Sequence, residues 1–144
     1  MDNFRIRKLE SSDGKDIGDI YKSIVRKPAD IDFITLIQKH AEFENYYCFV
    51  AELDDRVIGF IISYVLTLGF GIEKSAWIPA LGVYPEFMGQ GVGHLLAQEV
   101  FKIYKSLGIS RVYTSVRWDS TDMLSFYKTL GFERSEFINL KKYL

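Results

Sequence analysis

Residues 81–96 read LGVYPEFMGQGVGHLL, and this stretch decides how the rest of the sequence is interpreted. An apolar run that fits a buried strand is followed by glycines at positions 89, 91 and 93, and then by apolar residues at helical spacing. Glycine allows positive φ and a close approach of the backbone to a ligand. The N–H groups that open a helix lack partners within it, and the helix dipole adds partial positive charge there. The stretch therefore predicts a strand, a turn and a helix that together favour a bound phosphate or pyrophosphate.

Two common phosphate-binding signatures do not fit this turn. The dinucleotide fingerprint G-x-G-x-x-G fails because its last glycine would fall on His94 or Leu96, depending on the starting glycine. The loop of nucleotide triphosphatases needs Gly-Lys followed by Ser or Thr, which this turn does not contain. A glycine-rich helix cap without any ligand is the alternative that the residues alone leave open.

Composition indicates a globular protein. The chain has 144 residues, of which 48% are hydrophobic and 26% charged, so we expect a single domain over residues 1–144. A formal net charge of −1 gives no basic field for nucleic acid or an anionic membrane. Cys48 is the only cysteine, which excludes an internal disulfide, and we expect it in the core. Two histidines far apart in the sequence do not favour a metal site.

The N-terminal stretch MDNFRIRKLE carries charges from its second residue and does not resemble a signal peptide. No stretch approaches about 18 uninterrupted apolar residues, so we expect no membrane span. The expected location is therefore the cytoplasm.

Hydrophobic periodicity predicts alternating strands and helices. The expected strands are Phe4–Glu10, Tyr46–Leu53, Arg56–Leu68, residues 74–85, Ser110–Val116 and Phe132–Tyr143, and the expected helices follow Ser11–Asp13, Pro28, Gly89 and Asp119–Thr121. Asp54-Asp55 fits a tight hairpin turn, and Gly108 and Gly131 fit helix ends. Pro79 cannot donate to a ladder, so we expect irregular pairing there. The order indicates an α/β or α+β domain.

The glycine-rich turn resembles the acetyl-CoA loop of the GNAT superfamily of N-acetyltransferases. That signature is Arg or Gln, two residues, Gly, one residue, then Gly or Ala at a strand-to-helix turn, and its frame here is Met88, Gly91 and Gly93. The resemblance implies that the backbone of seven residues holds the pyrophosphate of CoA: Met88, Gly89, Gln90, Gly91, Val92, Gly93 and His94. Met88 replaces the usual Arg or Gln, which removes a side-chain contact but leaves the backbone donors.

Residues 119–132, DSTDMLSFYKTLGF, resemble the second landmark of the family, an Asn-x-x-Ala helix that ends in Tyr-x-x-Leu-Gly-Phe. Ser120 stands in place of the Asn that contacts pantetheine, and Met123 in place of the Ala. The resemblance places Tyr127 beside the CoA sulfur, where a leaving thiolate needs a proton or a strong hydrogen bond. A phenol and a thiol differ by about 1.5 pKa units, so a phenol stabilises the thiolate by hydrogen bonding even without full transfer. Read without the resemblance, Tyr127 is a core tyrosine on the apolar face of its helix.

The resemblance also implies that the strand before the glycine turn splays from the next strand and admits the pantetheine arm. Backbone groups of Leu81, Gly82 and Val83 would pair with that arm, and the N–H of Leu81 or Val83 would polarise the thioester carbonyl. The acceptor amine must be neutral to attack, so a base helps. Glu73 is the first candidate base and Glu86 the weaker one, because Glu86 is better interpreted as a solvated charge at the start of the helix.

The implied fold is a GNAT-type α/β domain with a mixed, mostly antiparallel sheet of about six or seven strands flanked by about four helices. The implied activity is transfer of the acetyl group from acetyl-CoA to a primary amine by direct attack in a ternary complex. The acceptor is a small molecule, a lysine or a protein N-terminus, without a nucleic-acid or membrane partner, and homodimers are common in the family. The alternative is a non-catalytic acetyl-CoA-binding sensor or interaction module.

Overall fold

The structure is a computed structural model that describes residues 3–25, 35, 46–67 and 74–144. The chain divides into two compact units, residues 1–114 and residues 115–144. The described residues of the first unit form a β-sheet and two α-helices, and those of the second form one α-helix followed by an extended tail. That both belong to one domain over residues 1–144 stays a prediction.

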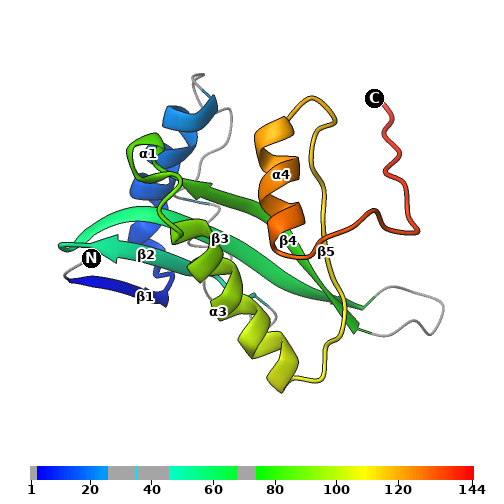
Figure 1. The fold of residues 1–144 in the computed structure, drawn as a ribbon, viewed down its shortest axis with the longest axis horizontal. Helices are drawn as coiled ribbons and strands as arrows, with labels where there is room; N and C mark the ends of the chain where they lie inside the picture. Colours follow the sequence, from blue (N-terminus) through cyan, green and yellow to red (C-terminus); the bar gives the residue numbers. More distant parts are fainter. Residues whose placement is uncertain (1–2, 26–34, 36–45, 68–73) are drawn as a thin grey trace. The chain divides into compact units, whose positions relative to one another are not determined.

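The sheet of the first unit has five strands in sequence order (Figure 1). They are β1 (Phe4–Lys8), β2 (Phe49–Leu53), β3 (Arg56–Thr67), β4 (Lys74–Val83) and β5 (Val112–Thr114). Neighbouring strands are antiparallel except β4 and β5, which are parallel. The expected α/β class with a mixed, mostly antiparallel sheet is confirmed. The described residues contain five strands and three α-helices, slightly fewer than the six or seven strands and four helices expected.

The hairpin between β2 and β3 turns at the expected residues. Asp54 and Asp55 both have positive φ, 51° and 65°. Two consecutive residues with positive φ match the twist of the flanking strands, and Asp tolerates this conformation better than most residues. The charged pair between two apolar runs therefore specified both the turn and the register.

The helices α1 (Gly14–Val25) and α3 (Val92–Ser106) cover opposite faces of this sheet (Figure 1). A Cβ added to Gly82 would lie 3.0 Å from Ile24 of α1, whereas one added to Gly59 would lie 3.3 Å from Leu96 of α3. Gly82 is opposite Phe60, the neighbour of Gly59, so the two glycines face opposite sides. The helix expected after Pro28 lies outside the described residues.

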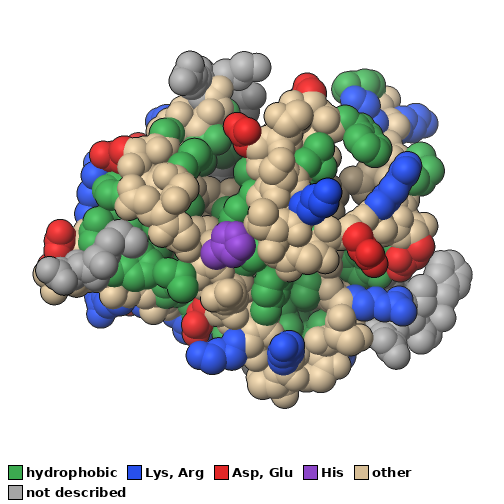
Figure 2. Space-filling model, in the orientation of Figure 1, with side chains coloured by type: hydrophobic (Ala, Val, Ile, Leu, Met, Phe, Trp, Pro, Cys, Tyr) green, Lys and Arg blue, Asp and Glu red, His purple; other side chains and the backbone are tan. Residues whose placement is uncertain are grey.

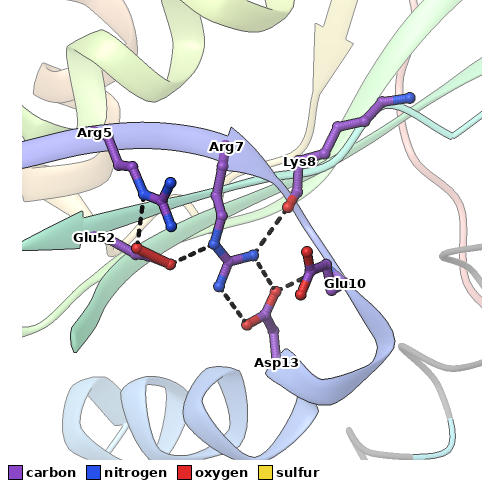
Figure 3. A network of polar contacts seen from close by, with 6 residues as sticks. All are labelled: Arg5, Arg7, Lys8, Glu10, Asp13 and Glu52. Atoms are coloured by element: carbon purple, nitrogen blue, oxygen red, sulfur yellow. Dashed lines mark hydrogen bonds and ion pairs between the residues drawn. The ribbon is translucent and has the colours of Figure 1, made fainter. Parts of the chain in front are cut away.

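A closed polar network joins β1, β2 and the residues that precede α1 (Figure 3). The Arg7 guanidinium donates to both oxygens of Asp13 at 2.8 Å and also bonds Glu52, which accepts a second bond from Arg5 at 2.9 Å. Asp13 also accepts the N–H of Glu10 at 2.7 Å. Both carboxylates are buried. The hydrogen bond from Arg7, followed by that from Arg5, lowers the pKa of Glu52, and Asp13 is the main cause of the raised pKa of Arg7.

The second unit corrects the strand expected after its helix. The strand expected over Phe132–Tyr143 does not form: residues 133–144 are all exposed, and without a neighbouring strand their N–H and C=O groups have no ladder to join. Ser120 is the N-cap of helix α4 (Thr121–Thr129), but its side chain makes no capping bond. Asp119 accepts two hydrogen bonds from Arg117, each 2.9 Å long. Trp118 is 81% exposed.

Charges on the surface follow no single sign. On the face shown in Figure 2, acidic and basic side chains are scattered among apolar and uncharged ones. In the part of the chain that the structure describes, no helix is long and apolar enough to cross a membrane. The same residues contain no group of three His, Cys, Asp or Glu side chains arranged to hold a metal ion.

Candidate functional site

The pairing between β4 and β5 is short, and this leaves an edge of β4 open. Only Ala76–Ile78 pairs with β5, and the last pair is closed by Thr114, whose Oγ1 donates to the carbonyl of Ile78 at 2.7 Å. β4 continues through Pro79–Val83, and no strand among the described residues pairs with it there on the β5 side. This short pairing agrees with the splayed strand pair that the family resemblance implies.

A β-bulge sits where Pro79 was expected to disturb the ladder. Tyr64 is opposite Trp77 and Ile62 is opposite Ala80, so Ser63 of β3 faces two residues of β4. Such an extra residue changes which side of the strand the following N–H and C=O groups point to. The expected irregularity is confirmed, and it has a consequence for the open edge.

The bulge determines which backbone donors face the open edge. The Tyr84 N–H donates to the carbonyl of Ile58 at 2.9 Å, which fixes the alternation of the antiparallel ladder at this end. N–H groups alternate in direction along a strand, and that of Tyr84 points to β3. The N–H groups of Val83 and Leu81 therefore point away from β3, toward the side where β5 no longer pairs with β4. A Cβ on Gly82 would lie 2.8 Å from the Phe60 ring and 3.0 Å from Ile24 of α1, so glycine permits α1 to pack here. That Gly82 also pairs with the pantetheine arm stays a prediction.

The glycine turn adds further donors. The 3₁₀ helix η2 (Pro85–Phe87) follows β4, and then Gly89 and Gly91 take positive φ, 78° and 87°. A Cβ built on either glycine meets nothing within 4 Å, so glycine is required by conformation, and the space beside this backbone is open. Gly91 is the N-cap of α3 and has no side chain to cap it, and the first turn contains no acidic residue. This end of α3 therefore suits an anion.

The residues predicted to hold pyrophosphate lie together in this turn. Met88 is half exposed, and Gln90 donates its amide to the Glu86 carbonyl at 3.4 Å. Val92 and Gly93 are buried in the first turn of α3, with His94 partly exposed beside them. Residues 88–94 therefore lie in the turn and in the first turn of α3, and that they hold a pyrophosphate stays a prediction.

Arg56 is a residue that the sequence interpretation missed. Its guanidinium pairs with Glu86 at 3.0 Å and lies 4.8 Å from the ring centre of Tyr84 and 5.7 Å from that of Phe87. It thereby ties the β2–β3 turn to the segment that leads into the glycine turn. Glu86, interpreted as a solvated charge, is exposed but ion-paired. No local pattern marks a pair separated by 30 residues, so this contact had no signal in the sequence.

Cys48 lies in the core of the first unit, as expected. Burial raises the pKa of its thiol to about 11. The carbonyl of Ser63 accepts the thiol at 3.7 Å, and the hydroxyl of Ser63 bonds that of Tyr104, whose pKa burial raises to about 12. Cys48 is therefore a neutral thiol at pH 7 and not a nucleophile.

The remaining predicted residues belong to the second unit or lie outside the described residues. Tyr127 belongs to the second unit, where it is buried and its ring lies 5.3 Å from that of Phe126 and 5.1 Å from that of Phe132. Ser120 is at the N-terminus of the same helix. Their approach to the glycine turn stays a prediction. Glu73, the candidate base, lies outside the described residues.

Comparison with known proteins agrees with this geometry. The family model described as the acetyltransferase (GNAT) family matches residues 15–132. An aminoglycoside acetyltransferase from an uncultured soil metagenomic sample, solved in complex with sisomicin, aligns with a TM-score of 0.82 and 24% identity over 99% of this chain and 96% of that chain.

Two further structures share the fold at lower identity. The aminoglycoside N-acetyltransferase AAC(6')-Iy, solved in complex with CoA, aligns with a TM-score of 0.82 and 17% identity over 97% of this chain and 94% of that one. The ribosomal-protein-alanine N-acetyltransferase of Brucella melitensis biovar Abortus 2308 aligns with a TM-score of 0.78 and 13% identity over 98% of this chain and 99% of that one.

Proposed function

Because the chain belongs to the acetyltransferase (GNAT) family, we propose that it transfers the acetyl group of acetyl-CoA to a primary amine by direct attack in a ternary complex. Two sets of backbone groups carry this proposal: the N–H groups of Leu81 and Val83 at the open edge of β4, and the glycine turn at the start of α3. Together they match an elongated ligand with a polar arm and a pyrophosphate.

The turn supplies the pyrophosphate site in this proposal. The backbone of Met88–His94 would bind the phosphates. Gly89 and Gly91 have positive φ, and a Cβ built on either meets nothing within 4 Å, so a ligand has room to approach this backbone. Helix α3 adds its dipole to these N–H groups. The substitution of Met for the usual Arg or Gln at position 88 leaves this backbone contribution intact.

The edge of β4 supplies the acyl site. The N–H groups of Leu81 and Val83 would pair with the pantetheine arm, and one of them would donate to the thioester oxygen as negative charge develops on it. The carbon–sulfur bond breaks as the amine nitrogen bonds the carbonyl carbon. We propose that Tyr127 donates a hydrogen bond to the departing thiolate, with Ser120 contacting the arm.

The acceptor amine is also part of this proposal. The similar structures include enzymes named for aminoglycosides and for a ribosomal protein. An α-amine near pKa 7.8 loses its proton at pH 7 for about 1 kcal/mol and a lysine near 10.4 for about 4.6 kcal/mol, so a lysine acceptor depends far more on a base. Glu73 is our candidate for that base.

Thermal unfolding with acetyl-CoA, NADH and ATP in parallel tests the cofactor. Acetyl-CoA at about 100 times its dissociation constant should add about 2.7 kcal/mol of stability, which is several degrees for a chain of this size. A shift with acetyl-CoA alone supports the proposal, and no shift reduces the glycine turn to a helix cap.

Release of CoA in the presence of amines then tests catalysis. Tyr127→Phe should lower kcat by 10-fold or more and leave the thermal shift with acetyl-CoA in place. A wild-type chain that binds acetyl-CoA but turns over no amine would instead be a sensor or interaction module.

A further inference from the structure

Four aromatic side chains lie side by side across the sheet of the first unit, and we call them the aromatic row: Tyr46, Tyr64, Trp77 and Tyr113. Tyr46 bridges to Tyr64, Tyr64 is opposite Trp77, and Trp77 is opposite Tyr113. Residues opposite one another in adjacent strands share a face of the sheet. The rings of Tyr46 and Tyr64 are 5.4 Å apart, and those of Trp77 and Tyr113 are stacked at 5.0 Å. All four residues are partly exposed.

The row lies at the mouth of the open edge of β4. Trp77 immediately precedes Ile78, the last residue of β4 that pairs with β5. Tyr46 packs against the core cluster that contains Ile17 and Ile20, so the row is on the face of the sheet that α1 covers. Leu81, the first donor of the open edge, follows four residues after Trp77, so a molecule seated on the row reaches it by extending along β4.

The indole of Trp77 has an unused donor. Its Nε1 is buried and has no hydrogen-bond partner in the described part of the chain. A buried donor without a partner costs the desolvation of that group, and such exceptions need an explanation. An oxygen atom of a bound molecule would remove this cost. Because the atom is closed off from water, the indole must shift slightly when that oxygen binds.

We propose that the aromatic row binds the amine substrate, and that this substrate is a hydroxylated amine of the amino-sugar type. The inference rests on the proposed acetyl transfer. Electron-rich ring faces attract an ammonium group. A sugar ring packs its flat C–H face on such rings and supplies a hydroxyl or ring oxygen to the indole N–H. A polyamine lacks that oxygen, and its protonated nitrogens accept no hydrogen bond.

The dimensions of the row agree with such a ligand. Its four residues span three inter-strand steps of about 4.8 Å, or about 14 Å in all. That length accommodates two or three linked sugar rings. An amine at one end of the molecule then lies beside Ile78 and the open edge while the rest of the molecule covers the tyrosines.

Fluorescence of Trp77 gives a direct binding test. The chain has two tryptophans, so Trp118→Phe leaves Trp77 as the only indole. Titration with sisomicin should change its emission saturably, because the indole exchanges a buried unpaired state for a hydrogen bond. Spermidine and a peptide with an N-terminal alanine should change it little. A flat titration with sisomicin, or a saturable change with spermidine alone, overturns the inference.

Kinetics of two matched variants give a second test. Trp77→Phe keeps a ring against Tyr113 and removes the N–H, so the KM for sisomicin should rise about 10-fold while the KM for acetyl-CoA stays within twofold. Trp118→Phe, the same change at an exposed residue, should leave both values unchanged. An unchanged KM for sisomicin in Trp77→Phe contradicts the proposed hydrogen bond.

The thermal shift with acetyl-CoA separates this inference from the proposed function. If acetyl-CoA fails to stabilise the wild-type chain, the proposed function itself fails. If acetyl-CoA stabilises it and only the peptide or spermidine is acetylated, the acetyl transfer stands and the amino-sugar site is wrong.

Discussion

The polar network at β1 and the open edge at β4 lie in the same sheet but handle their polar groups in opposite ways. In the network of Arg5, Arg7, Asp13 and Glu52, every charged group meets a partner from the same chain. At the β4 edge and the glycine turn, backbone donors point to a side where no described strand receives them. The first arrangement holds the fold together, and the second is available to a ligand.

This difference separates charged residues that stabilise the fold from groups that are candidates for ligand binding. Two buried carboxylates beside two arginines look like a catalytic centre, but their charges are already paired and Glu52 has a lowered pKa, so it is a poor base. The glycine turn contains no conspicuous side chain, and its backbone is nevertheless the better candidate for binding. Removing a partner should therefore cost stability in the first region and cofactor affinity in the second.

Arg7→Met should have the largest effect on stability. It leaves Asp13 and Glu52 buried without their main partner, and breaking such a pair costs about 3–5 kcal/mol. Urea unfolding measures the loss, and the KM for acetyl-CoA of the folded variant should stay within twofold of wild type. Arg117→Met, which breaks an exposed pair with Asp119, is the matched control and should leave the urea midpoint in place. A loss below about 1 kcal/mol in Arg7→Met would show that the network is not closed.

Acid should weaken the network in a defined direction. Because Arg7 and then Arg5 lower the pKa of Glu52, this residue adds stability above its unfolded pKa, about 4.3, and that stability is lost as pH falls through the folded value. Glu52→Gln should cost about 1.5 kcal/mol at pH 7 and less at each lower pH. Urea midpoints of both proteins between pH 7 and pH 3 measure this difference. A difference that is constant with pH would mean that Glu52 titrates normally.

The glycine turn offers a sharper comparison because the chain contains its own control. Gly91 and Gly108 lie at the two ends of α3 with φ of 87° and 76°, and a Cβ on either meets nothing within 4 Å. Alanine at either position should cost about 1 kcal/mol of stability through the same backbone strain. Only Gly91→Ala should also raise the KM for acetyl-CoA, by about 10-fold, because its Cβ enters the space of the ligand. Equal KM values would remove the cofactor from this turn.

Features set by neighbouring residues could be predicted from the sequence. Four features depend on local backbone preferences, and the structure has all of them: the Asp54-Asp55 turn, the bulge at Pro79, the glycine at the end of α3 and the glycine turn around Gly91. The sequence around Gly91 also carried the prediction of the cofactor site, since that site is made of backbone groups.

Features that depend on distant partners could not be predicted. Arg56 and Glu86 meet across 30 residues, and the aromatic row forms only when β3, β4 and β5 come into register and Tyr46 bridges to Tyr64. The tail after Phe132 has strand-like composition, but composition cannot supply the neighbouring strand that it needs. Ser120 likewise has the right residue type for a cap and makes no capping bond.

Arg56→Gln should produce the smallest effect, and it tests whether the two regions are joined. The pair with Glu86 is more than half exposed on both sides, so its loss should cost at most about 1 kcal/mol of stability. The guanidinium nevertheless fixes the segment from Tyr84 to Phe87, which leads into the glycine turn. The KM for acetyl-CoA should therefore rise two- to threefold while kcat stays unchanged, and Arg56→Lys should restore part of the loss through its charge alone. Lys102→Gln, which removes an exposed charge from α3, is the control for a general electrostatic effect. A fall in kcat without a rise in KM would show that Arg56 acts on the reaction itself rather than on the placement of the turn.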